Sequence, residues 1–171
     1  MLVWLSILGI WIMDRILKLL IQGSFSPNET LILWPKVLHL TYVLNPGAAF
    51  GLMAGQTRIL IIAAVVVVAG IIYAQFKIPT QKKLTRLSLG MIGGGALGNL
   101  YDRVVGGKVV DYLDFQIWPF VFNFSDITIG VGVILLLSLI YFDNRKVGRA
   151  DRLNIILTKP EQLQRESSKA R

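Results

Sequence analysis

The sequence predicts an all-α membrane protein of four transmembrane helices with a small β element on the extracytoplasmic side. Three observations favour this class. Apolar residues make up 54% of the 171 positions, charged residues only 16%, and the mean hydropathy is +0.60, whereas soluble domains carry about 25% charged residues. Four apolar stretches have the length of a bilayer span, and most basic residues gather in two places. A soluble globule would lack the polar surface to cover such a chain.

The four apolar stretches are residues 2–21, 59–76, 84–101 and 126–142. A hydrocarbon core of about 30 Å is crossed by about 20 helical residues, so each stretch is long enough or nearly so. The second and fourth contain almost no charge, and the third is rich in glycine, which lets helices approach closely. The first contains Asp14, Arg15 and Lys18. It lacks a basic leader and a cleavage site, so we expect it to remain in the mature protein.

The basic residues predict the topology. Twelve of the 18 Lys and Arg residues lie either between positions 77 and 86 or after position 142, whereas the two long connections carry few. The positive-inside rule therefore places the 77–86 loop and both termini in the cytoplasm. Residues 1–142 are expected to form the membrane domain. Residues 143–171 are expected to form a basic, polar cytoplasmic tail.

The two long connections are then extracytoplasmic. Three prolines interrupt residues 22–56, and residues 38–44 are predicted to form a short strand that ends at Asn45-Pro46-Gly47. The second connection, residues 102–125, mixes aromatic and polar residues. Aromatic side chains favour the headgroup level, so we expect this segment to lie on the membrane surface.

Unusual polar residues gather at the outer ends of the spans. Ionisable residues near or within spans are costly and indicate function, and a layer of them at one depth indicates a site. Asp14 and Lys18, four residues apart, could neutralise each other or support this layer, and Arg103 could be only an interfacial anchor. The layer consists of Asp14, Lys18, Asn45, Asn99, Arg103, Asp111, Asn123 and Asp126.

Composition excludes several chemistries. The chain has no cysteine, which excludes thiol nucleophiles and thiolate metal sites. His39 is the single histidine, so a multi-histidine metal site is also excluded, and no nucleophile-elbow motif surrounds any serine. We interpret His39 as an interfacial loop residue. Paired carboxylates remain, and the outer-face candidates are Asp102, Asp111, Asp114 and Asp126.

Four motifs resemble those of lipoprotein signal peptidase, also called signal peptidase II, a family of integral-membrane aspartic proteases. They occur in the family's order and extend the resemblance through residue 142. Ser125 stands where the family usually has alanine, a change between small residues. The motifs are DRILK at positions 14–18, NPGAAFG at 45–51, GGALGNLYDRVVGGKVVDY at 94–112 and FNFSD at 122–126.

The resemblance implies an aspartic endopeptidase whose catalytic pair is Asp111 and Asp126. Two carboxylates held close tend to share one proton, so one can activate water while the other donates a proton to the scissile carbonyl. Asp114 is expected to be solvated. The other matched polar residues would bind the substrate backbone or brace the aspartates; they are Asn45, Asn99, Arg103, Asn123, Asp14 and Lys18.

The resemblance also implies the substrate and the location. The substrate would be the signal peptide of a prolipoprotein, with a diacylglyceryl-modified cysteine just after the cut, and peptide-like inhibitors of the globomycin type would bind the same site. The enzyme would be a multi-pass protein of the bacterial cytoplasmic (inner) membrane, with its site at the extracytoplasmic face. No metal, organic cofactor or nucleic acid is implied. We also expect residues 22–56 to close over the bound peptide.

Two other functions remain open from the residues alone. A small transporter or proton-relay protein could use Asp14, Lys18, Asp111 and Asp126 as a relay. A non-enzymatic assembly subunit could use the glycine-rich span as an interaction face.

Overall fold

The computed structural model describes residues 1–47 and 55–145. Residues 1–135 form one compact unit, and the last ten described residues belong to a second. Positions 48–51 of the NPGAAFG motif and most of the expected tail lie outside the described residues.

Four helices occupy the predicted apolar stretches, each a few residues longer than expected. They are α1 (Leu2–Ser24), α2 (Thr57–Lys77), α3 (Lys83–Gly106) and the helix Phe124–Arg145. Among the described residues, α2 and the helix Phe124–Arg145 are long and apolar enough to cross a membrane. Charged residues within α1 and charged and small residues within α3 lower their hydropathy, so the four-span topology stays a prediction.

Helix α1 places its polar residues inward and its apolar residues outward. Asp14 and Lys18 are fully buried, whereas Leu5 and Leu19 are more than 60% exposed. Because burying unpaired charges costs free energy in any protein, these two side chains must find partners inside the fold. An apolar exterior around a polar interior is the reverse of a soluble protein and is typical of a chain surrounded by lipid.

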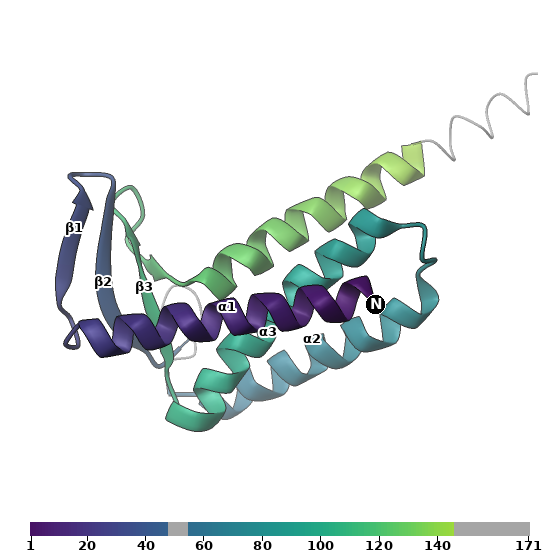
Figure 1. Cartoon of the computed structure of the whole chain (residues 1–171). Coiled ribbons are helices and arrows are strands. Elements are labelled where there is room, and N and C mark those ends of the chain that lie inside the picture. Colours follow the sequence, from purple (N-terminus) through teal and green to yellow (C-terminus); the bar gives the residue numbers. More distant parts are fainter. Residues whose placement is uncertain (48–54, 146–171) are drawn as a thin grey trace, which may run out of the picture. The chain divides into compact units, whose positions relative to one another are not determined.

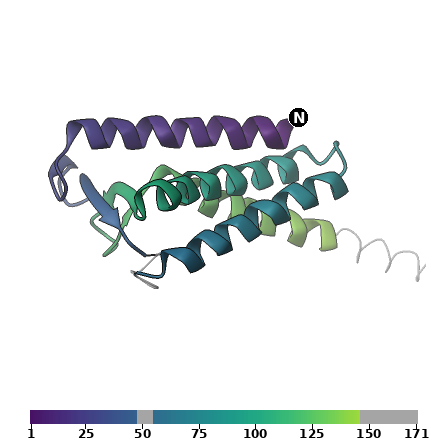
Figure 2. The same cartoon turned by 90° about the horizontal axis from the view of Figure 1, so that it is seen from below.

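Helix α3 is the centre of the helical part and contacts both α1 and α2 (Figures 1 and 2). Its glycines permit close approach on two sides. A Cβ at Gly94 would lie 2.8 Å from the Cβ of Ile10 on α1, and a Cβ at Gly95 would lie 2.5 Å from the backbone oxygen of Ser125. The sequence expectation of a close-packed glycine face is therefore confirmed.

A four-stranded antiparallel sheet lies at one end of α1 and α3 (Figure 1), with the strand order β1-β2-β3-β4. Its strands are β1 (Thr30–Trp34), β2 (Leu38–Asn45), β3 (Val109–Phe115) and β4 (Val121–Phe122). The predicted strand at 38–44 is confirmed. The strand region was expected only between the first two helices, whereas the second connection also contributes strands: β3 pairs with β2 in the sheet and is buried over its first four residues. Its valine and aromatic residues favour that conformation.

The pairing of β2 with β3 places the side chains of β3 on two opposite faces of the sheet. Val43 lies opposite Asp111, and the pairing shifts between Leu40 and Val43, an irregularity of the kind that re-aims side chains near functional sites. One face of β3 carries Val110 and Tyr112, which pack against the end of α1. Asp111 belongs to the other face, because successive strand residues alternate.

We predict that Gly95→Ala destabilises the protein by about 1–3 kcal/mol, because the added methyl group overpacks the contact with Ser125. Gly70→Ala on α2 is the matched control, since nothing lies within 4 Å of its added Cβ, and alanine favours a helix over glycine. Thermal unfolding of both purified variants in detergent measures the effect. Equal melting temperatures for Gly95→Ala and the parent chain would contradict the close packing.

Candidate active site

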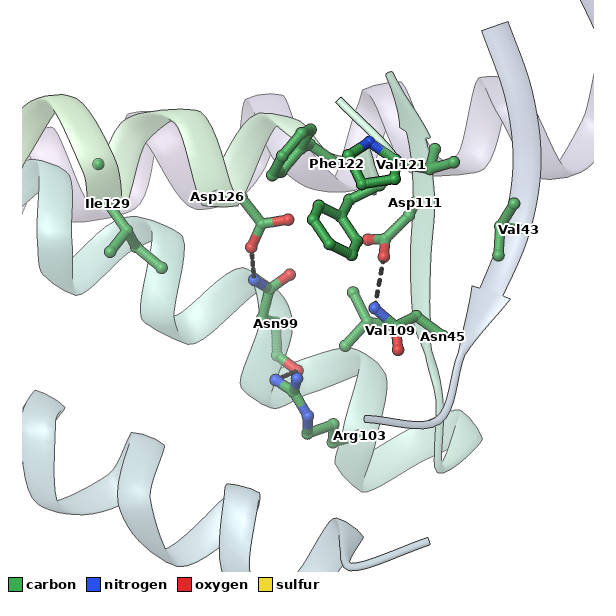
Figure 3. Close-up of a pocket in the computed structure, with 13 residues that line it drawn as sticks. Val43, Asn45, Asn99, Arg103, Val109, Asp111, Val121, Phe122, Asp126 and Ile129 are labelled. Carbon is green, nitrogen blue, oxygen red and sulfur yellow. Dashed lines mark hydrogen bonds between the residues drawn. The ribbon is translucent and has the colours of Figure 1, made fainter. Parts of the chain in front are cut away.

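A cavity of about 530 Å³ lies between the sheet and the ends of α3 and the helix Phe124–Arg145. Figure 3 shows the carboxyl groups of Asp111 and Asp126 directed toward it from different elements. Apolar side chains from the α1–α2 connection and from the segment between α3 and the last helix complete its wall. The full lining is Val43, Asn45, Asn99, Arg103, Val109, Asp111, Pro119, Phe120, Val121, Phe122, Asp126, Ile129 and Gly130.

Asp111 is held by two side-chain amides. It is the third residue of β3 and is 2% exposed. Asn45 Nδ2 donates to its Oδ2 at 2.8 Å (Figure 3), and Asn123 Nδ2 donates to its Oδ1 at 2.6 Å. Each carboxyl oxygen therefore has a protein donor, so the rotamer of Asp111 is fixed from two sides.

Asp126 is held by the start of its own helix and by α3. The backbone N–H of Asn123 donates to Asp126 Oδ2 at 3.2 Å, and the backbone N–H of Asp126 donates to Asn123 Oδ1 at 3.0 Å. This reciprocal pair is a capping box, which fixes the beginning of the helix. Asn99 Nδ2 donates to the other carboxyl oxygen, Oδ1, at 2.7 Å. Asn123 therefore contacts both aspartates.

Lys18 determines the orientation of the Asn99 amide. Its Nζ donates to Asn99 Oδ1 at 3.0 Å, and Asn123 Nδ2 donates to the same oxygen at 3.1 Å. Because an ammonium group has only donors, the oxygen of Asn99 must face Lys18 and its NH₂ must face Asp126. Lys18 on α1 thus orients the Asn99 amide so that its NH₂ group donates to Asp126.

Lys18 belongs to a buried cluster of two basic and two acidic residues. Its Nζ lies 3.0 Å from Asp14 and 2.7 Å from Asp102. Arg15 bridges the same two carboxylates, at 3.2 Å and 2.7 Å. The cluster has no net formal charge, which offsets the cost of burying it. Asp14 and Lys18 therefore pair with each other, and Lys18 also contacts Asn99, which lines the cavity.

Two more polar contacts attach this cluster to neighbouring elements. Asp14 Oδ1 accepts the backbone N–H of Ser125 at 3.3 Å, and Asp102 Oδ2 accepts the backbone N–H of Val110 at 3.2 Å. The first contact ties α1 to the helix that carries Asp126, and the second ties α3 to the strand that carries Asp111. The ion-pair cluster is thus hydrogen-bonded to Ser125 and Val110, the residues that precede Asp126 and Asp111 in the chain.

Arg103 connects α3 to the segment between α1 and α2. Its Nη2 donates to the carbonyl oxygen of Gly47 at 2.9 Å, and the N–H of Gly47 donates to Asn45 Oδ1 at 2.9 Å. Arg103 also lines the cavity, and through Gly47 it is connected to the Asn45 side chain, whose amide group donates to Asp111.

Burial, together with the negative charge of Asp126, raises the pKa of Asp111 to about 7. This value already includes the opposing effect of the hydrogen bonds from Asn45 and Asn123 and of the charge of Lys18, which lower the pKa. A carboxyl group with this pKa is partly protonated near neutral pH, which is the condition for a shared proton.

Asp114 does not join the site. It lies three residues beyond Asp111 on β3, so the alternation of a strand turns it to the opposite face, where it accepts a hydrogen bond from Thr41 Oγ1 at 2.9 Å. His39 lies opposite Asp114 in the β2–β3 register, on a strand. The interpretation of His39 as a loop residue is therefore wrong.

Sequence reasoning missed the role of Arg15 and left Asp102 among the possible catalytic acids. Asp102 instead pairs with Arg15 and Lys18. The sequence shows a charged pair in the first span and another at the end of the third, but not that the two helices bring these residues together. Within residues 1–47 and 55–145, no group of three or more His, Asp or Glu side chains could hold a metal ion.

Comparisons with known proteins agree on one family. The family model described as signal peptidase (SPase) II matches residues 6–142. A lipoprotein signal peptidase of Desulfitobacterium hafniense is 64% identical over 146 residues, which cover 85% of this chain and 97% of that protein. A lipoprotein signal peptidase of Moorella thermoacetica is 49% identical over 123 residues, covering 72% and 81%.

Two solved structures described as a bacterial membrane enzyme, determined by the in meso method, share the fold. One has a TM-score of 0.79 at 28% identity and covers 83% of this chain and 88% of its own. The other has a TM-score of 0.74 at 28% identity and covers 81% and 91%.

We predict that two substitutions move the pKa of Asp111 in opposite directions. Asp126→Asn removes a nearby negative charge and lowers it, whereas Asn45→Ala removes a donor to the carboxylate and raises it. Carboxyl ¹³C NMR titration of the aspartate-labelled protein measures both shifts. If Asp126→Asn leaves the titration of Asp111 unchanged, the two carboxyl groups do not interact.

Proposed function

We infer, because the chain belongs to the signal peptidase II family, that Asp111 and Asp126 act together as a water-activating pair. The chain is an aspartic-type peptidase that cleaves signal peptides from prolipoproteins. The observation that carries the proposed pair is the convergence of two carboxyl groups on one cavity, with Asn123 hydrogen-bonded to both.

The proposed reaction needs one proton on the pair. The ionised carboxylate takes a proton from water as the water oxygen attacks the scissile carbonyl carbon, and the protonated carboxyl group donates its proton to the carbonyl oxygen. The resulting diol then transfers a proton to the amide nitrogen through the same pair, and the C–N bond breaks. The products are a new carboxyl terminus and a new amino terminus, and the pair regains its single proton.

The side-chain amides next to the pair support the proposal that one aspartate acts as the base while the other acts as the acid. Asn45 and Asn99 each donate to a different aspartate, and Asn123 contacts both. These donors stabilise the negative charge that remains on the singly protonated pair without a metal ion. Arg103 lines the cavity, and its guanidinium would attract the backbone carbonyl groups of the substrate.

The proposed substrate is a signal-peptide helix in the bilayer, followed by a diacylglyceryl-modified cysteine. The apolar lining of the cavity and the apolar exterior of α1 and α2 support a lipid-bearing substrate at the membrane surface.

We propose that the chain crosses the inner membrane four times, with both termini in the cytoplasm. Residues 1–142 would form the protease domain, with its site at the outer face, and a basic tail would follow it. A proton relay is less well supported, because the interiors of α2 and the helix Phe124–Arg145 offer no charged residues.

We predict that Asp111→Asn and Asp126→Asn each lower prolipoprotein cleavage by about a hundredfold or more, because each removes one proton-transfer group. Asp114→Asn is the matched control on the opposite face of the same strand and should retain most activity. Cleavage of a lipid-modified precursor by the purified variants, with thermal unfolding to verify folding, is the measurement. Near-parental turnover by either of the first two variants would exclude the pair.

We also predict a basic limb in the pH dependence of kcat/KM near pH 7. The pKa of Asp111 is raised to about 7, so the protonated form is present below that pH and is lost as the pH rises through it. Activity should then fall by about tenfold per pH unit. A profile that stays flat to about pH 9 would contradict a shared proton on this pair.

A further inference from the structure

A second cavity has a volume of about 440 Å³. Its lining residues come from the end of the helices that is remote from the sheet, where α2 is followed by α3 (Figure 1). It is formed where α2 ends and α3 begins, with the first turn of α1 beside it. Its lining combines two basic residues, Lys77 and Arg86, with Trp4, Phe76 and Ile78. None of these residues belongs to the Asp111–Asp126 site.

Arg86 is a buried cation with spare donors. It is 8% exposed, and its Nη1 donates to the carbonyl oxygens of Gln75 at 3.2 Å and Ile78 at 3.0 Å. These bonds satisfy the end of α2 but leave Nη2 and Nε without a protein hydrogen bond in the described ranges. No carboxylate forms an ion pair with Arg86 in these ranges either, since the ion pairs found there involve Arg15 and Lys18.

The charges around this cavity favour an anion. Lys77 is exposed and lies on the ring of Tyr73, with its Nζ 5.6 Å from the centroid. The first turn of α3 contains no acidic residue and has no side-chain cap, so the start of this helix adds positive potential. A guanidinium with two free donors next to an ammonium is suited to a phosphate group.

The apolar surroundings identify the source of that phosphate. Helix α2 is 21 residues long, about 32 Å, so Lys77 at its end reaches the headgroup level when the helix crosses a bilayer core of about 30 Å. Phe76 is 75% exposed and Trp4 is 45% exposed beside the cavity, where they would contact acyl chains. Basic pockets at the ends of transmembrane helices are sites for anionic lipid headgroups.

We propose that this cavity binds the phosphate headgroup of an anionic phospholipid, held by the guanidinium of Arg86 and the ammonium of Lys77. The lipid supplies the negative charge that the buried Arg86 lacks within the described residues. Its tails run along the exposed apolar side chains of α1 and α2. The site is separate from the catalytic pair and would fix this end of the chain at the membrane surface.

Native mass spectrometry of the purified full chain in detergent tests the proposal, with dioleoylphosphatidylglycerol and dioleoylphosphatidylcholine as the two probes. The parent chain should retain phosphatidylglycerol in preference to phosphatidylcholine. Lys77→Gln should lower that retention by about fivefold and leave phosphatidylcholine unchanged. Because Lys77 is exposed, this variant should fold; Arg86→Gln should lower retention further, with its folding verified by thermal unfolding.

Lys36→Gln, on the turn between β1 and β2, is the matched control and should bind both lipids as the parent chain does. Equal retention of the two lipids, or unchanged phosphatidylglycerol binding in a folded Lys77→Gln variant, would overturn the proposal. Binding of inorganic phosphate with the same dependence on Lys77, in the absence of lipid, would overturn the assignment to a lipid.

Discussion

The hydrogen bonds of three asparagines hold two acidic side chains at one cavity, and the rest of the fold is arranged to supply them. Asn45 comes from β2, Asn99 from α3 and Asn123 from the start of the last helix. Amides can donate without adding charge, so they fix the carboxylates and still let the pair keep a proton. A lysine or arginine in direct contact with Asp111 would instead favour the doubly ionised state and remove the acid that the proposed reaction needs.

The positive charge of Lys18 is separated from the pair by the Asn99 amide. Lys18 contacts Asn99 rather than an aspartate of the pair, and its charge is balanced by Asp14 and Asp102. This arrangement gives the amide a fixed orientation and limits the direct effect of the ammonium on the pair. The glycines of α3 serve the same purpose, because Gly98 leaves the space that the carboxyl group of Asp14 occupies. Both the charge balance around Lys18 and the close packing at Gly98 are therefore needed to place the ion-pair cluster next to the site.

Much of this arrangement could be predicted from the sequence, and the reasons are physical. Long apolar stretches identify the helices, and unusual polar residues at one depth identify the layer that contains the site. Strand pairing between β2 and β3 could not be predicted, because the two segments are separated by two helices and neither pattern reveals its partner. For the same reason, the opposite directions of Asp111 and Asp114 became evident only once the strand was recognised. Pairing of Asp102 with Arg15 likewise depends on the α1–α3 contact rather than on local sequence.

An experimental structure of the chain with a non-cleavable prolipoprotein peptide tests the central claim most directly. In the paired mechanism, the group that replaces the scissile carbonyl must lie between Asp111 and Asp126, within about 3 Å of a carboxyl oxygen of each. The amides of Asn45 and Asn99 should keep their present carboxylate partners in that complex. A peptide bound elsewhere, or one whose cleavage site approaches only one of the two carboxyl groups, would contradict the paired mechanism.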